Sequence, residues 1–159
     1  IERGHVAPAA RPRDPQIGDA AAKGGRVLVG GKAMADRPGY FFEPTVVADA
    51  SHDMTLMTEE SFGPVIGIQK VKEDREAMRL MNDTRYGLTS GVFTQDPERA
   101  QRILRKINSG TVYWNCCDRV SPRLPWSGRG DSGVGVTLGD EGIRSFVRPK
   151  AWHWRAPQA

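Results

Sequence analysis

The sequence has few cysteines and no long apolar run, and each shortage excludes a class of protein. Its two cysteines, Cys116 and Cys117, are neighbours, so they cannot join distant segments and lack the paired spacing of a zinc site. No apolar stretch approaches the roughly 20 residues that cross a bilayer, and residues 1–16 are polar where a secretory signal needs an apolar centre. We therefore expect a soluble cytoplasmic protein that has neither a membrane partner nor a bound metal.

Acidic charge is also in deficit, with a formal net charge of +4 and a pI near 9.3. A basic surface attracts phosphates, and residues 144–155 combine arginine and lysine with tryptophan in a way that could stack bases. Interleaved basic and aromatic residues at a terminus are more often a strand that docks on a sheet, so we expect no nucleic-acid partner. The three histidines lie in dissimilar contexts, which argues against acid–base or metal roles.

Hydrophobic periodicity predicts an α/β fold over most of the chain. Apolar and β-branched runs alternate with helical patterns, the clearest of which has Asp96 as N-cap and Pro97 at the first helical position. The expected strands are 65–71, 88–94 and 111–115, and the expected helices between them are 74–81 and the one that follows Asp96. This β-α-β-α-β order with short links is typical of a parallel sheet covered by helices.

The two ends of the chain predict less regular structure. Residues 1–16 are rich in proline and are expected to form an irregular tail, whereas 17–146 are expected to form the folded domain. A first helix is predicted at 17–23, strands at 26–29 and 40–47, and a last helix at 140–146. The final segment, 147–159, is predicted to be an extended arm.

The segment Glu59-Glu60-Ser61-Phe62-Gly63-Pro64 is the strongest candidate for a functional site. It places an acidic pair and an aromatic ring directly before an apolar strand. Gly63 permits unusual backbone angles and Pro64 fixes φ, so Glu60 and Phe62 should point in defined directions. Taken alone, the segment could equally be an ordinary acidic turn before a strand.

Four blocks, at 39–46, 59–65, 82–88 and 109–115, agree in order and spacing with a known family. Together they closely resemble the C-terminal part of the NAD(P)-dependent aldehyde dehydrogenase superfamily, from about residue 20 to about residue 150. The resemblance implies the second half of an aldehyde dehydrogenase catalytic domain, with NAD or NADP as cofactor and an aldehyde as substrate. It also implies a homo-oligomer, because the family's C-terminal tail lies near its subunit contacts.

The resemblance assigns roles to individual residues. It implies that Glu60 accepts hydrogen bonds from the hydroxyls of the nicotinamide ribose and that Phe62 packs against the same end of the cofactor. It further implies that four residues line the substrate tunnel: Cys117, Asp118, Val120 and Trp126. The family's catalytic cysteine and glutamate lie upstream of these blocks, so no catalytic residue is expected in this chain.

Other candidate residues have weaker claims. Arg119 or Arg123 could pair with a substrate carboxylate if one points into the tunnel, although a solvent-facing arginine is the commoner case. The glycines of residues 128–133 spell G-x-G-x-x-G, but that fingerprint binds a pyrophosphate only where it follows a strand and opens a helix. The sequence also departs from the family at Val136 and Thr137, which replace the usual Arg-Glu pair.

Two functions remain open from the sequence. The chain is expected to be the C-terminal portion of an enzyme that oxidises aldehydes to carboxylic acids, inactive in isolation. The alternative is a non-catalytic remnant that acts as an interaction or assembly module through the surface that the missing part would have covered.

Overall fold

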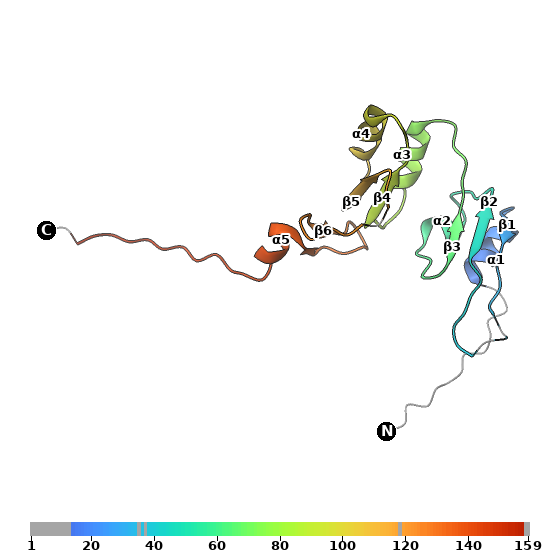
Figure 1. Ribbon diagram of the computed structural model, residues 1–159, viewed down its shortest axis with the longest axis horizontal. Helices are drawn as coiled ribbons and strands as arrows, with labels where there is room; N and C mark the ends of the chain where they lie inside the picture. The colour runs from blue at the N-terminus through green and yellow to red at the C-terminus, as the bar shows by residue number, and fades with distance from the viewer. Residues whose placement is uncertain (1–13, 35, 37, 118, 158–159) are drawn as a thin grey trace, which may run out of the picture. The chain divides into compact units, whose positions relative to one another are not determined.

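The computed structural model describes residues 14–157 except residues 35, 37 and 118 (Figure 1). Its chain forms two compact units, Ile1–Thr84 and Arg85–Ala159. The first unit contains a three-stranded sheet and the second contains two two-stranded sheets, with helices packed on them. Within the described ranges, no helix is both long and apolar enough to cross a membrane.

The first unit is built on a three-stranded sheet of β1 (Arg26–Val29), β2 (Thr45–Ala48) and β3 (Val65–Gly67), in that order. Strand β2 is in the centre, antiparallel to β1 and parallel to β3. Its Thr45 and Val47 are buried, as expected for alternate residues that face the core from a central strand.

Two helices complete the core of the first unit. Helix α1 (Pro15–Ala22) begins with a capping bond from the Gln16 amide to the Asp14 carboxylate, 2.8 Å long, and has proline at its first position. The short helix α2 (Thr55–Thr58) packs against α1. The buried cluster of this unit consists of Ala20, Val47, Ala50, Met54 and Leu56. Helix α3 (Asp74–Asn82) follows β3 and has no fully buried residue.

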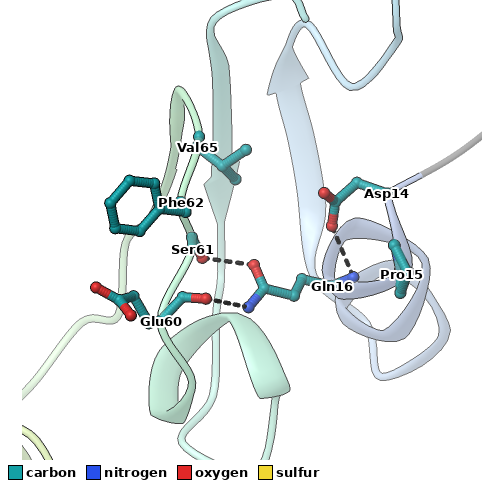
Figure 2. A pocket seen from close by; sticks show the side chains of 8 residues that line it. Asp14, Pro15, Gln16, Glu60, Ser61, Phe62 and Val65 are labelled. Atoms are coloured by element: carbon teal, nitrogen blue, oxygen red, sulfur yellow. Dashed lines mark hydrogen bonds between the residues drawn. The ribbon is translucent and has the colours of Figure 1, made fainter. Parts of the chain in front are cut away.

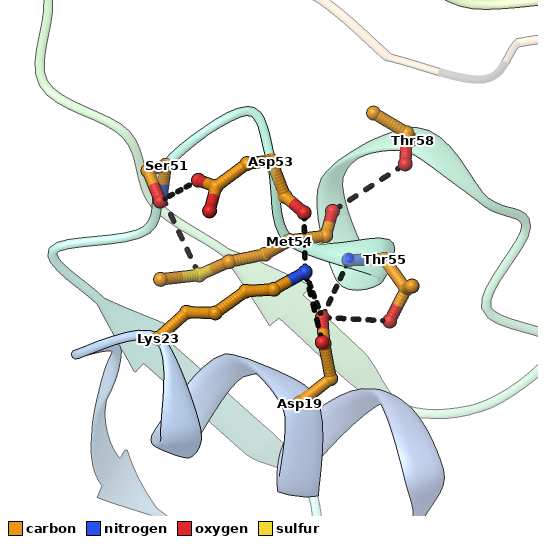
Figure 3. A network of polar contacts seen from close by, with 7 residues as sticks. All are labelled: Asp19, Lys23, Ser51, Asp53, Met54, Thr55 and Thr58. Carbon is orange, nitrogen blue, oxygen red and sulfur yellow. Dashed lines mark hydrogen bonds and ion pairs between the residues drawn. The ribbon is translucent and has the colours of Figure 1, made fainter.

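A polar network joins α1 to α2 at the edge of this core (Figure 3). The Asp19 carboxylate accepts hydrogen bonds from the Thr55 amide, at 2.8 Å, and from the Thr55 hydroxyl, at 3.1 Å. It also forms an ion pair with Lys23 at 2.9 Å, and the Lys23 ammonium group donates to the Asp53 carbonyl. The first turn of α2 is therefore held against α1 by specific polar contacts as well as by packing.

The second unit contains the parallel pair β4 (Thr89–Val92) and β5 (Thr111–Trp114), connected by helix α4 (Pro97–Leu104). The Asp96 side chain caps α4 by accepting from the Arg99 amide at 3.0 Å, as its sequence predicts. A two-residue antiparallel pair, β6 (Trp126–Ser127) and β7 (Val136–Thr137), precedes helix α5 (Gly139–Arg144). After α5 the described chain has no further helix or strand and is mostly exposed.

The α/β class with parallel strand pairing is confirmed, and two details of the prediction need correction. Strands β3, β4 and β5 were expected in one sheet, but β3 pairs with β2 in the first unit and β4 pairs with β5 in the second. The predicted tail of residues 1–16 ends too late, because Pro15 and Gln16 already belong to α1. The other predicted tail residues, 1–13, lie outside the described part of the chain.

Candidate functional site

The acidic-aromatic segment lies between the end of α2 and the start of β3. Helix α2 ends at Thr58, and the backbone of Glu59 is already extended. Two short backbone bonds, from Gly63 to the Ser61 carbonyl and from Val65 to the Gly63 carbonyl, tighten the following turn, each at 2.8 Å. The Pro64 carbonyl then accepts from the Thr45 amide of β2, also at 2.8 Å, so the segment is anchored to the sheet where it enters β3.

Gly63 does not have the role expected from its sequence context. Its φ is not positive, and a Cβ placed on it would meet no atom within 4 Å. The turn therefore does not require glycine for backbone reasons. Instead, Gly63 leaves open space at the edge of a pocket.

Helix α1 holds the segment through Gln16, a contact that the sequence alone did not indicate (Figure 2). The Gln16 amide nitrogen donates to the Glu60 carbonyl at 3.2 Å, and the Ser61 hydroxyl donates to the Gln16 amide oxygen at 2.5 Å. Only a side chain with both a donor and an acceptor can make these two bonds at once. Because Gln16 is 44 residues from Glu60 in the sequence, no local pattern could have revealed the contact.

Glu60 and Phe62 project to the same side of the segment, whereas Ser61 between them points toward Gln16 (Figure 2). This alternation is what an extended backbone produces, because successive side chains point in opposite directions. Both side chains are exposed, and the Phe62 ring is 97% accessible. A carboxylate and an apolar ring are thus presented together, and neither is used in packing the core.

A pocket of about 250 Å³ lies beside these two residues. It is lined by Asp14, Pro15 and Gln16 at the start of α1, and by Glu60–Gly63 and Val65. Among the described residues, no hydrogen bond or ion pair occupies the Glu60 carboxylate. The two oxygens of Glu60 can therefore accept from a pair of ligand hydroxyls while the ring covers an apolar or aromatic group.

The predicted tunnel residues lie in the second unit, between the end of β5 and β6. Cys117 and Val120 are exposed, and Trp126 is half-buried in β6. Asp118, predicted with them, lies outside the described residues. Arg119 and Arg123 are both exposed, so their side chains are accessible to solvent.

The loop that carries these residues is held at the carboxyl ends of β4 and β5. Asn115 has a left-handed backbone, with φ at 53°, and its side-chain amide forms two 2.9 Å bonds with the backbone of Thr94. Further along the loop, the hydroxyl of the buried Tyr113 donates to the Arg119 carbonyl at 3.2 Å. The sequence placed Asn115 at the end of the strand but did not indicate its left-handed backbone, which asparagine adopts more readily than most residues.

The glycine-rich loop at 128–133 does not have the geometry of a phosphate cradle. The Asp131 amide donates to the Arg85 carbonyl, and the Ser132 and Gly133 amides donate to carbonyls within the loop. A Cβ on Gly130 would lie 2.2 Å from the Arg85 carbonyl oxygen, so this glycine serves a close backbone contact. No helix begins at the loop, which agrees with the expectation that the fingerprint lacks its required context.

Comparison with protein families places this arrangement in a known group. A profile described as the aldehyde dehydrogenase family matches residues 10–152. Chloroplastic betaine aldehyde dehydrogenase of Beta vulgaris is 39% identical over 135 residues, which cover 84% of this chain and 27% of that protein. Aminoaldehyde dehydrogenase 2 of Zea mays is 36% identical over 151 residues, which cover 89% of this chain and 30% of that protein.

Solved structures give the same grouping. Betaine aldehyde dehydrogenase from Staphylococcus aureus, crystallised with NAD+, matches with a TM-score of 0.76 and 39% identity, over 82% of this chain and 26% of that one. Lactaldehyde dehydrogenase from Escherichia coli matches with a TM-score of 0.80 and 32% identity, over 84% of this chain and 28% of that one. The chain thus spans less than a third of the length of these relatives.

Proposed function

The chain belongs to the aldehyde dehydrogenase family, and on this premise we propose that it provides a nicotinamide-ribose contact and part of a substrate tunnel. The proposed enzyme, of which this chain forms the C-terminal portion, oxidises an aldehyde to a carboxylic acid with NAD or NADP. The observation that carries the proposal is the shared direction of Glu60 and Phe62 beside an open pocket (Figure 2). When bound, the cofactor would supply the nicotinamide ring that takes up a hydride.

Glu60 has the chemistry that the ribose contact needs. Its carboxylate is exposed and can accept from two vicinal hydroxyls at once, which a neutral amide oxygen does less strongly. Phe62 offers a flat apolar surface to the same ligand, and covering such an exposed ring is favourable. These side chains therefore fit the redox end of a dinucleotide.

Gln16 and Ser61 position these groups through hydrogen bonds to one another and to the Glu60 backbone. The Gln16 side chain binds the Glu60 carbonyl and the Ser61 hydroxyl, and both bonds leave the Glu60 carboxylate unused. A carboxylate whose backbone is already fixed loses less conformational entropy when it binds. We therefore assign Gln16 and Ser61 a positioning role.

Family membership and the position of the β5–β6 loop support the proposed tunnel wall. Trp126 is half-buried and can present a large flat ring to an apolar substrate. Cys117, Asp118 and Val120 complete the proposed wall, with Asp118 assigned from the sequence alone. The identity of the aldehyde and the choice between NAD and NADP depend on contacts outside these residues.

Binding of nicotinamide mononucleotide to the 159-residue chain tests the proposed site. We expect saturation-transfer NMR to show contact with the ribose and nicotinamide protons. Glu60→Gln should weaken binding about tenfold or more, because a hydrogen bond to a charged group contributes about 1.5–3 kcal/mol, and Phe62→Ala should reduce transfer to the ring protons. Glu59→Gln, which removes the same charge one residue earlier, is the matched control. Equal binding by the Glu60→Gln and Glu59→Gln variants would exclude the ribose contact.

Several wider features remain proposals. We expect the isolated chain to lack dehydrogenase activity, since the family's catalytic cysteine and glutamate do not fall within the matched blocks; steady NADH formation from NAD and a short aldehyde would contradict this. A homo-oligomeric enzyme and a cytoplasmic location also stay predictions. The relatives include chloroplastic and mitochondrial proteins, so family membership does not fix the location.

A further inference from the structure

We propose that Cys116 and Cys117 form a vicinal dithiol site that covalently binds a monosubstituted trivalent arsenical. The proposal rests on the adjacency and accessibility of the two thiols and on the anchoring of the residues beside them. It does not depend on the proposed cofactor contact.

Both thiols are available for reaction. They are free, Cys117 is exposed and Cys116 is half-buried. They are also the only cysteines in the 159-residue sequence. Any reagent that requires two thiols of one chain must therefore use this pair.

Hydrogen bonds anchor Asn115, directly before the pair, and Arg119, shortly after it. On the preceding side, the Asn115 amide nitrogen of the backbone donates to the Val92 carbonyl at 2.9 Å, and its side chain forms two further bonds with Thr94. On the following side, the Arg119 carbonyl accepts from the Tyr113 hydroxyl at 3.2 Å. Anchored flanking residues lower the conformational entropy that the pair loses when both thiols engage one atom.

The surroundings argue against two other uses of the pair. Structural zinc needs four ligands, and among the described residues no group of three or more histidine, cysteine or acidic side chains could hold a metal. A disulfide between neighbours is strained, because adjacent Cα atoms are about 3.8 Å apart and disulfides prefer about 4.4–6.8 Å. Strained disulfides are easily reduced.

A trivalent arsenic atom avoids both difficulties. It needs only two sulfur ligands, because it carries its own third substituent, and it separates the sulfurs by bridging them. In the reaction R–As(OH)₂ plus two thiols, two S–H bonds and two As–O bonds break and two As–S bonds form. Two molecules of water leave and arsenic remains in the +3 state, so no oxidant or reductant is required.

The test uses phenylarsine oxide, which hydrates to the dihydroxy form, with the full chain. We expect intact-mass spectrometry to show one phenylarsenic group per chain and the loss of both thiols to iodoacetamide labelling. Ethanedithiol should remove the group, whereas 2-mercaptoethanol at the same total thiol concentration should not. The single variants Cys116→Ser and Cys117→Ser should each bind at least about a hundredfold more weakly, since chelation multiplies affinity by about 10²–10⁴.

Several results would overturn the proposal. Two arsenicals per chain, or equal removal by the monothiol, would show that the thiols react separately. Single serine variants that bind as tightly as the wild type would exclude the pair as the site. The stoichiometry and the removal experiment use the unaltered chain, so both stand even if a variant folds poorly.

Discussion

Asp19 illustrates how one residue links the core to the candidate site. Its carboxylate binds the first residue of α2, and α2 ends directly before the segment that carries Glu60. The same carboxylate pairs with Lys23 of its own helix, which in turn reaches the Asp53 carbonyl (Figure 3). Loss of this charge should therefore loosen α2 and, through it, the start of the site.

The pH dependence of stability should reveal this contribution. The hydrogen bond from Lys23, followed by that from the Thr55 amide, lowers the pKa of Asp19 from its ordinary value of 3.8. A lowered folded-state pKa means that the stabilisation is complete above the unfolded value and is lost as pH falls through the folded value. We expect the thermal unfolding temperature of the wild type to decrease as the pH is lowered below about 4. At neutral pH, Asp19→Asn should unfold at a lower temperature than the wild type, but its unfolding temperature should change less over the same acid range.

Asp49→Asn is the matched control for Asp19→Asn. Asp49 also carries a carboxylate paired with a cation, Arg26, at 3.1 Å, but the pair is at the exposed edge of the sheet. It has a left-handed backbone, with φ at 54°, that asparagine tolerates. If Asp49→Asn lowered the thermal unfolding temperature at neutral pH as much as Asp19→Asn, the decrease would result from the loss of a negative charge and not from the loss of the α1–α2 contact.

At the scale of elements, Gly110 fixes how closely β6 approaches the start of β5. A Cβ at this position would lie 1.5 Å from the Ser127 carbonyl oxygen, which is a backbone atom and cannot rotate away. We expect Gly110→Ala to lower the free energy of unfolding of the second unit by about 1–3 kcal/mol, the usual cost of forcing extra atoms into a packed site. Chemical denaturation followed by hydrogen exchange at β4 and β5 would measure it.

Gly135→Ala provides the comparison within the same unit. No atom lies within 4 Å of a Cβ placed there, and its φ is not positive. The free energy of unfolding of the Gly135→Ala variant should stay within about 0.5 kcal/mol of the wild-type value, as for most surface substitutions. If Gly110→Ala were equally mild, the close contact between Gly110 and Ser127 would not exist in solution.

The elements that the sequence predicted well are those with complete local signals. Helix α4 has an N-cap, a first-turn proline and apolar residues at helical spacing, and it begins at Pro97 as expected. Strands β4 and β5 were also found, each shorter than predicted. Where the capping, proline and periodicity features of an element lie within about ten residues of sequence, they are sufficient to predict that element.

The elements that were missed depend on contacts between distant residues. Helix α2 has four residues and is stabilised by Asp19, 36 positions earlier in the sequence. The small pair β6–β7 is only two residues long on each side, too short for any periodicity. In the candidate site, Glu60 and Phe62 could be named from the motif, whereas Gln16 could not, because its role arises only when α1 packs beside the segment.

At the scale of the whole molecule, exposed apolar side chains outnumber buried ones. Among the described residues, twenty large hydrophobic side chains are exposed and ten hydrophobic residues form the buried cores. Monomeric proteins do not usually leave so much apolar surface in contact with water. The relatives are more than three times as long as this chain, and we expect this apolar surface to associate with other protein.

The isolated chain should therefore bind an apolar dye and associate as its concentration rises. We expect anilinonaphthalene sulfonate fluorescence to increase at neutral pH while the near-ultraviolet circular dichroism of the tryptophans persists, which separates exposed native surface from a molten globule. Sedimentation velocity should show a range of sizes that shifts with concentration, because the apolar residues are spread along both units. A single discrete oligomer would instead support the alternative of an assembly module, since closed assemblies need one self-complementary surface. A monomer without dye binding at any concentration would contradict the argument, because it would mean that the exposed side chains repack within the chain.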